Sequence, residues 1–214
     1  MKTIVCYGDS NTHGYNGEDG GTRFPYDVRR PGVLQGLLGS EYMVKEEGLN
    51  GRTTVFPDPL YEGMSGNDFI TIATQTHKPV DLLIVMLGTN DTKERFGATP
   101  GMIAKGMERL VTKAMNKNEA FTDEKPNVLI ICPPAIRPGN EAEFDDGEMG
   151  HGVVEKSRKL APYYAATAEL LGCHFLDAGS IEGIEMNTVD CMHLTAASHR
   201  RLAEVLAEMI PEIV

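Results

Sequence analysis

A serine, a histidine and an aspartate in this chain have types and spacings that could support nucleophilic catalysis. Ser10 lies in a turn-forming stretch that follows an apolar run. Asp190 precedes His193 by three residues, a spacing that in a turn lets the carboxylate reach the imidazole Nδ1 and leaves Nε2 free. A serine becomes an effective nucleophile when a base accepts its proton and a third group orients that base. Ser10, His193 and Asp190 are therefore a candidate catalytic triad.

Acyl transfer also needs hydrogen-bond donors directed at the developing oxyanion. The backbone N–H groups of Ser10 and Gly51 and the side-chain amide of Asn90 could supply them, since a glycine lets the backbone approach a ligand closely. Each residue also has a simpler interpretation. Ser10 could cap a helix, Gly51 could be a turn glycine, Asn90 could bond its own loop, and the aspartate–histidine pair could be a structural turn. Taken singly, the simpler interpretations of Gly51, Asn90 and the aspartate–histidine pair are the more common ones, so the fold must decide.

The elements that would position these residues alternate between strands and helices. Short apolar runs predict strands at 3–7, 41–46, 81–87, 127–132 and 173–177. Apolar residues at helical spacing, with a proline or a capping residue near the start of several segments, predict helices at 31–38, 65–75, 99–115, 153–171 and 195–210. This alternation predicts a parallel sheet covered by helices on both faces, in one domain that spans residues 1–214.

The candidate residues follow the ends of four predicted strands. Ser10 follows the first strand, Gly51 the second, Asn90 the third, and the turn at 190–193 comes after the fifth. The carboxyl ends of parallel strands meet at one edge of a sheet, which is where ligands bind in open α/β folds. We therefore expect these turns to converge on one site.

The composition excludes several other classes of function. The net charge of −11 disfavours binding to nucleic acids or anionic membranes, and no apolar run approaches the ~18 residues of a membrane span. The four cysteines are widely spaced without a C-x-x-C pair, so we expect neither a metal site nor disulfides. The nucleotide motifs G-x-G-x-x-G and the P-loop are absent, so we expect no cofactor. With no signal peptide visible, we expect a cytoplasmic protein.

The segments around the candidate residues also resemble a known family. Four segments resemble the sequence blocks of the SGNH hydrolases, also called the GDSL esterase/lipase superfamily: Gly8-Asp9-Ser10, Gly51, Gly88-Thr89-Asn90-Asp91 and Asp190-x-x-His193. Their order and spacing match over nearly the whole chain. The longer stretches 46–54 and 86–93 resemble the bacterial arylesterase/acyltransferase branch of that superfamily.

The resemblance implies a fold, a reaction and a role for each candidate residue. The fold would be a flavodoxin-like three-layer α/β/α sandwich with a five-stranded parallel sheet. Ser10 would be the nucleophile, His193 the base and Asp190 its orienting group, and Ser10, Gly51 and Asn90 would form the oxyanion hole. The chain would be a serine ester hydrolase that cleaves small carboxylic esters, with short-chain acyl or aryl groups, through an acyl-enzyme. It could also transfer the acyl group to an alcohol that competes with water.

The resemblance leaves some features open. Asn11 departs from the pattern, because many members carry leucine there, and we expect it to tune the polarity of the pocket. A carbohydrate O-acetylesterase, a thioesterase and a lysophospholipase are alternatives within the superfamily, and a non-catalytic flavodoxin-like binding module is a remote one. The acidic stretch 135–152 could be a lid or a subunit contact. The family branch favours a homo-oligomer acting on a small-molecule ester.

Overall fold

A five-stranded parallel sheet forms the centre of the computed structural model, which describes residues 1–139 and 141–214. In this described part the strand order is β4-β1-β5-β6-β7. The strands are β1 Lys2–Gly8, β4 Tyr42–Gly48, β5 Leu82–Met86, β6 Val128–Cys132 and β7 His174–Asp177. This is the order of flavodoxin-like folds. The predicted α/β class and five-stranded parallel sheet are therefore confirmed.

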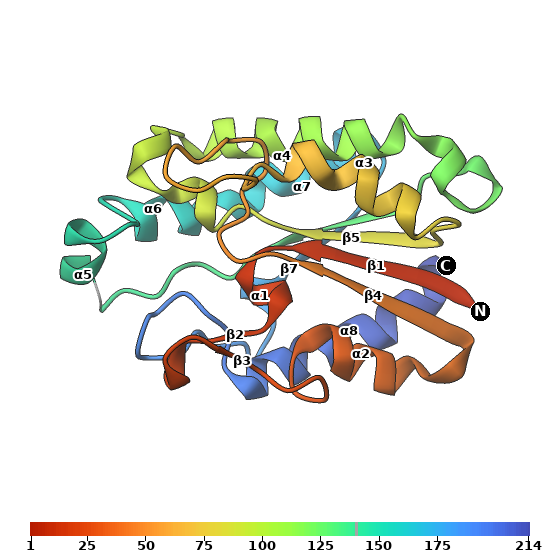
Figure 1. The fold of residues 1–214 in the computed structure, drawn as a ribbon, viewed down its shortest axis with the longest axis horizontal. Coiled ribbons are helices and arrows are strands. Elements are labelled where there is room, and N and C mark those ends of the chain that lie inside the picture. Colours follow the sequence, from red (N-terminus) through yellow and green to blue (C-terminus); the bar gives the residue numbers. More distant parts are fainter. Residues whose placement is uncertain (140) are drawn as a thin grey trace.

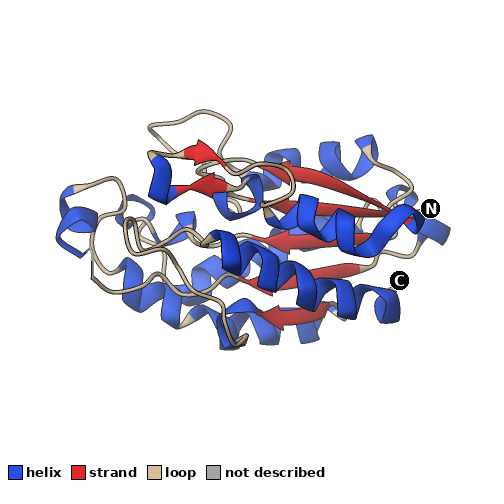
Figure 2. Cartoon of the chain, turned by 90° about the horizontal axis from the view of Figure 1, so that it is seen from below, coloured by secondary structure: helices blue, strands red, loops and turns tan. Residues whose placement is uncertain are grey.

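Helices cover both faces of the sheet, as Figure 1 shows. One face carries α3 Gly66–Thr76, α4 Pro100–Met115 and α7 Leu160–Leu171, and the other carries α2 Arg30–Leu38 and α8 Ala196–Ile213. Successive side chains of a strand point to opposite faces. Accordingly, Val5 and Tyr7 of β1 pack among α3, α4 and α7, whereas Ile4 and Cys6 pack toward α2 and α8. Figure 2 shows the second face, where two helices lie along the strands.

Several short elements lie near the carboxyl ends of the strands (Figure 1). They are the short helix α1 Ser10–His13, the hairpin of β2 Tyr15–Asn16 with β3 Thr22–Arg23, and the helices α5 Glu141–Asp146 and α6 Val153–Arg158. Among the described residues, no helix has both the length and the apolar character that crossing a membrane requires.

The predicted helix 153–171 is two helices, α6 and α7, that meet at Lys159. Pro162 in the first turn of α7 explains the break. A proline has no N–H with which to bond the carbonyl of Arg158, and its ring would clash with that carbonyl in a continuous helix. The same proline is well tolerated in the first turn of a new helix, which therefore begins just before it.

The last helix carries the chain back from the edge of the sheet toward its middle. Strand β7 is an edge strand, but α8 packs against α2 on the face near β1, which is the second strand from the opposite edge. Thr195 caps α8, and its side chain accepts a hydrogen bond from the backbone N–H of Ser198 at 3.1 Å. The segment between β7 and α8 thereby crosses the carboxyl edge of the sheet, and this crossing brings residues 187–194 to the end of β1.

Candidate active site

Ser10 is the first residue of α1, directly beyond the end of β1. Asp9 occupies the N-cap position, and its carboxylate accepts a hydrogen bond from the N–H of Asn11 at 2.9 Å. Only 7% of the surface of Ser10 is exposed. Burial raises the pKa of Asp9 to about 6, against the lowering effect of the Asn11 N–H and of His193. Asp9 thus braces the turn, while the Ser10 hydroxyl stays available for chemistry.

The predicted triad is assembled by the fold. Ser10 Oγ lies 2.8 Å from His193 Nε2, and His193 Nδ1 lies 2.8 Å from Asp190 Oδ2. Both distances are those of hydrogen bonds. With neutral imidazole, Nδ1–H donates to Asp190 and Nε2 accepts from the Ser10 hydroxyl. This is the geometry that a serine needs in order to lose its proton to an oriented base.

Asp190 is held as a carboxylate by a set of donors. Its Oδ1 accepts from the backbone N–H groups of Met192 and His193, each at 3.0 Å, and from the Asn187 amide at 2.8 Å. Partial burial raises the pKa of Asp190, but the His193 hydrogen bond and charge and the two backbone N–H groups outweigh it and lower the pKa to about 2. The charged form therefore persists over the ordinary pH range and favours the Nδ1–H tautomer of His193.

Asn11 connects the loop of residues 190–194, here called the histidine loop, to the turn that contains Ser10. Its Oδ1 accepts from the N–H of Leu194 at 2.9 Å, and its Nδ2 donates to the carbonyl of Met192 at 3.1 Å. These two residues flank His193, so one buried amide fixes the backbone on both sides of the base. Asn11 is 1% exposed. The expectation that it tunes pocket polarity is therefore replaced by a positioning role, which a leucine could not perform.

The three expected oxyanion donors lie at the same edge of the sheet. Gly51, with φ of +81°, has the left-handed backbone that glycine adopts without strain. Asn90 follows β5 in a short 3₁₀ turn, and its Nδ2 donates to the carbonyl of Arg52 at 3.1 Å. An amide nitrogen carries two hydrogens, so the second one remains for another acceptor. Gly51 and Asn90 line one cavity with Ser10.

Two buried residues that sequence reasoning gave no role hold these donors in place. The Arg52 guanidinium lies 4.2 Å from the centre of the Tyr7 ring and donates from Nη1 to the carbonyls of Gly8, at 2.9 Å, and Glu47. Asp91 accepts from the N–H of Thr54 at 2.9 Å and also bonds the Thr54 hydroxyl. The loops after β1, β4 and β5 are thus tied to one another. Asp91 follows directly on Asn90 in the quoted motif, but nothing in its sequence neighbourhood indicated that its partner would be Thr54.

The hairpin β2–β3 covers the aspartate–histidine pair, and sequence reasoning missed it. The predicted strands leave residues 8–40 without one. The Tyr15 ring lies 4.3 Å from the His193 ring, centre to centre, at an interplanar angle of 34°. Gly17 packs so tightly that a Cβ there would lie 1.8 Å from Asp190 Oδ2. The hairpin therefore shields the aspartate–histidine pair, and only a glycine at position 17 leaves room for this close approach.

The cavity in front of the triad has a volume of about 260 Å³. It is lined by Ser10, Tyr15, Asn50, Gly51, Asn90, Lys93, Glu148, Met149, Met192 and His193. Asp190 is not in the lining and lies behind His193. Glu148 and Met149 belong to the acidic stretch 135–152, so this part of the stretch borders the cavity as a lid would.

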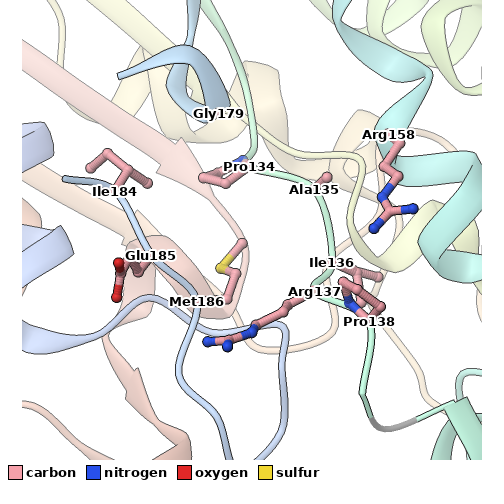
Figure 3. Close-up of a pocket in the computed structure, with 10 residues that line it drawn as sticks. All are labelled: Pro134, Ala135, Ile136, Arg137, Pro138, Arg158, Gly179, Ile184, Glu185 and Met186. Atoms are coloured by element: carbon pink, nitrogen blue, oxygen red, sulfur yellow. The ribbon is translucent and has the colours of Figure 1, made fainter. Parts of the chain in front are cut away.

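A second cavity, of about 410 Å³, lies beyond the ends of β6 and β7 and is shown in Figure 3. No residue of the triad lines it. Arg137 and Arg158 contribute its two guanidinium groups, and Figure 3 shows these groups turned apart rather than toward a shared point. Volume alone does not identify the reaction site, and of these two cavities it is the smaller one that contains a serine hydroxyl beside an imidazole.

Solved structures of esterases are similar to the chain over its full length. The structure of an aryl esterase from M. smegmatis is 38% identical, with a TM-score of 0.91 and complete coverage of both chains. A carbohydrate acetylesterase from Sinorhizobium meliloti is 33% identical, also with a TM-score of 0.91 and complete coverage of both chains. At these identities the likeness extends beyond the fold.

A curated relative and a family model agree with the structural neighbours. An acetylxylan esterase from Xylanibacter ruminicola is 24% identical over 223 residues; the match covers 97% of this chain and 42% of that protein, so the chain spans less than half of its relative's length. The model of the GDSL-like lipase/acylhydrolase family matches residues 6–201. Nearly the whole chain is thus matched, including every segment that contributes to the site. The chain belongs to the GDSL-like lipase/acylhydrolase family.

Proposed function

We propose that this protein is a serine esterase that cleaves small carboxylic esters through an acyl-enzyme, with Ser10 as the nucleophile. The observation that carries the proposal is the hydrogen-bonded chain from Ser10 Oγ through His193 to Asp190, with 2.8 Å at each step. The relatives described as aryl esterase and carbohydrate acetylesterase support the same reaction class. None of these relatives is a non-catalytic module, so that alternative has no support.

In the first half-reaction, His193 Nε2 accepts the Ser10 proton as Oγ forms a bond to the ester carbonyl carbon. The carbonyl oxygen becomes an oxyanion, which accepts hydrogen bonds from the N–H groups of Ser10 and Gly51 and from the Asn90 amide. The intermediate then breaks its bond to the alcohol oxygen, which takes the proton back from His193. The acyl group stays on Ser10.

In the second half-reaction, water attacks the acyl-enzyme. His193 accepts a proton from the water, the same donors hold the second oxyanion, and the bond to Ser10 Oγ breaks as that oxygen regains its proton. An alcohol that takes the place of water receives the acyl group instead, so the same residues perform transesterification. Asp190 stays ionised throughout and stabilises the imidazolium that forms in each half.

A carbohydrate O-acetylesterase is the second candidate. It is favoured by two relatives, described as a carbohydrate acetylesterase and an acetylxylan esterase. The chemistry at Ser10 is identical in the two cases, and only the alcohol differs. Turnover of acetylated xylo-oligosaccharides, compared with that of aryl acetates at equal concentration, separates them.

The location and assembly of the protein are part of the proposal. We expect a cytoplasmic homo-oligomer built from a single domain of residues 1–214. The expected location is supported by the wide cysteine spacing, and the expected assembly by the resemblance to the arylesterase/acyltransferase branch. Light scattering of the purified protein measures the oligomeric state.

The central experiment is Ser10→Ala with p-nitrophenyl acetate as substrate. We expect turnover to fall to near the uncatalysed rate, because the hydroxyl is the attacking group. A serine-directed phosphonate should label the original protein and not this variant. Full retained turnover in Ser10→Ala would contradict the assignment. A chain-length series of p-nitrophenyl esters then defines the acyl group.

A further inference from the structure

A buried ammonium group lies in the wall of the Ser10 cavity and has no role in the mechanism above. Lys93 follows the Asn90 turn, and its side chain is 6% exposed. It lines the same cavity as Ser10, Gly51 and Asn90. The described lining residues include no other lysine and no arginine. Burying a charge is costly unless a partner compensates it, so the surroundings of this ammonium need an explanation.

The nearest carboxylate to Lys93 is committed to another cation. Lys93 Nζ lies 3.8 Å from Asp58 Oδ2, which is beyond hydrogen-bonding distance. That same oxygen accepts hydrogen bonds from Arg95 Nε at 3.2 Å and Arg95 Nη2 at 2.8 Å. Within residues 1–139 and 141–214, Lys93 Nζ donates no hydrogen bond to the protein. Burial and then the Arg95 charge lower the pKa of Lys93 by more than the charges of Asp58, Glu148 and Asp9 raise it, so the ion pair with Asp58 compensates this cation only in part.

The second carboxylate near the cavity is also engaged. Glu148 Oε1 bonds the Tyr61 hydroxyl, and Glu148 Oε2 lies 3.8 Å from Arg95 Nη2. The Glu148 side chain is 57% exposed, so water compensates much of its charge. Lys93 therefore presents three N–H donors at the cavity wall, and neither neighbouring carboxylate takes them up.

We propose that Lys93 binds an anionic oxygen of the substrate, and that the enzyme prefers esters carrying a carboxylate near the scissile carbonyl. Half-esters of small dicarboxylic acids and aryl esters with a ring carboxylate belong to this class. The cavity of about 260 Å³ accommodates molecules of this size. The inference deepens the proposed esterase function and rests on it.

The test compares kcat/KM for matched charged and neutral esters in the original protein and in Lys93→Met. On the acyl side the pair is monoethyl succinate and ethyl 4-methylpentanoate, which have similar shapes; on the alcohol side it is 3-carboxyphenyl acetate and 3-nitrophenyl acetate. A charge-assisted hydrogen bond typically contributes enough to change binding by about tenfold or more. In at least one pair, we expect the charged-to-neutral ratio to fall by about tenfold or more in Lys93→Met.

Lys105→Met is the matched control, because it removes the same charge from an exposed lysine that pairs with Glu108 on α4. Its charged-to-neutral ratio should equal that of the original protein. Charged-to-neutral ratios in Lys93→Met within about twofold of the original in both pairs would overturn the proposal. If Lys93→Met does not fold, competitive inhibition of the original protein tests the proposal instead. Stronger inhibition by succinate than by 4-methylpentanoate supports an anion site, and equal or weaker inhibition refutes it.

Failure of this inference can be distinguished from failure of the esterase assignment. Hydrolysis of the neutral esters that disappears in Ser10→Ala establishes the proposed function whatever the charged esters do. Unchanged charged-to-neutral ratios in Lys93→Met, with Ser10-dependent hydrolysis retained, contradict the inference about Lys93 alone.

Discussion

Replacement of Asn11 by leucine tests how the histidine loop is held. The substitution removes two hydrogen bonds and leaves the Leu194 N–H and the Met192 carbonyl without their side-chain partner. Each unsatisfied buried backbone group costs about 1–3 kcal/mol. Because the Met192 carbonyl is only partly buried, water recovers part of its share, and we expect the free energy of unfolding to fall by about 2 kcal/mol.

The catalytic effect of Asn11→Leu should exceed what the lost stability explains. His193 lies between the two freed backbone groups, and a displacement of about 1 Å at a catalytic group can cost on the order of a hundredfold in rate. We expect kcat for p-nitrophenyl acetate to fall about tenfold to a hundredfold with KM little changed, at a temperature where the variant is fully folded. The assay pairs steady-state kinetics with urea denaturation of the same samples.

Thr74→Val is the control for this experiment. The Thr74 hydroxyl is buried in α3, donates to the Ile70 carbonyl at 3.1 Å and lies outside the active-site cavity. Its loss should lower stability without changing kcat. If Asn11→Leu behaves in the same way, with lower stability and unchanged kcat, Asn11 is a structural residue and the reasoning about the loop is refuted.

Three further predictions address other parts of the site. Asn90→Ala should keep the fold and lower kcat at least ~10²-fold, because one oxyanion donor is lost, and an unchanged kcat would remove Asn90 from the oxyanion hole. Gly17→Ala should lower kcat, because the new methyl group must displace the Asp190 carboxylate or the hairpin, while the hydrolysis product stays the same. Kinetics equal to those of the original protein would show that the hairpin moves away freely. Burial raises the pKa of Asp91 to about 7 from an ordinary value of 3.8, so the folded chain binds more protons than the unfolded chain between these values, and stability should fall as pH rises through that window. Asp9, whose pKa is raised to about 6, adds to this slope, and His199, whose pKa is lowered to about 3, opposes it. The test is therefore the difference between the original protein and Asp91→Asn in urea denaturation from pH 4 to 8: the variant should lose less stability as pH rises, and an identical slope would assign the proton to another group.

The parallel sheet and the convergence of its strand-end turns could be anticipated because buried strands and their turns leave local signals. The run 81–87 is apolar almost throughout, as a central parallel strand requires, and its turn carries Asn90. The roles of Asn11 and Asp91 could not be anticipated, since their partners, Leu194 and Thr54, are 183 and 37 residues away. The hairpin at 15–23 was missed because strands of two residues are too short to show any alternation. The break before Pro162 could have been predicted from the sequence, because a proline rarely lies inside a helix.

The crossing of the chain from β7 back to β1 has a consequence for biosynthesis. Ser10 emerges from the ribosome 183 residues before His193, and no local segment contains both groups. A partly synthesised chain therefore carries an unactivated hydroxyl that forms no acyl-enzyme, however early β1 pairs with its neighbours. We therefore expect phosphonate labelling during refolding to follow the arrival of residues 187–194 at the end of β1 rather than the pairing of β1 with its neighbouring strands. In this molecule we expect the gain of activity to measure when the fold is complete.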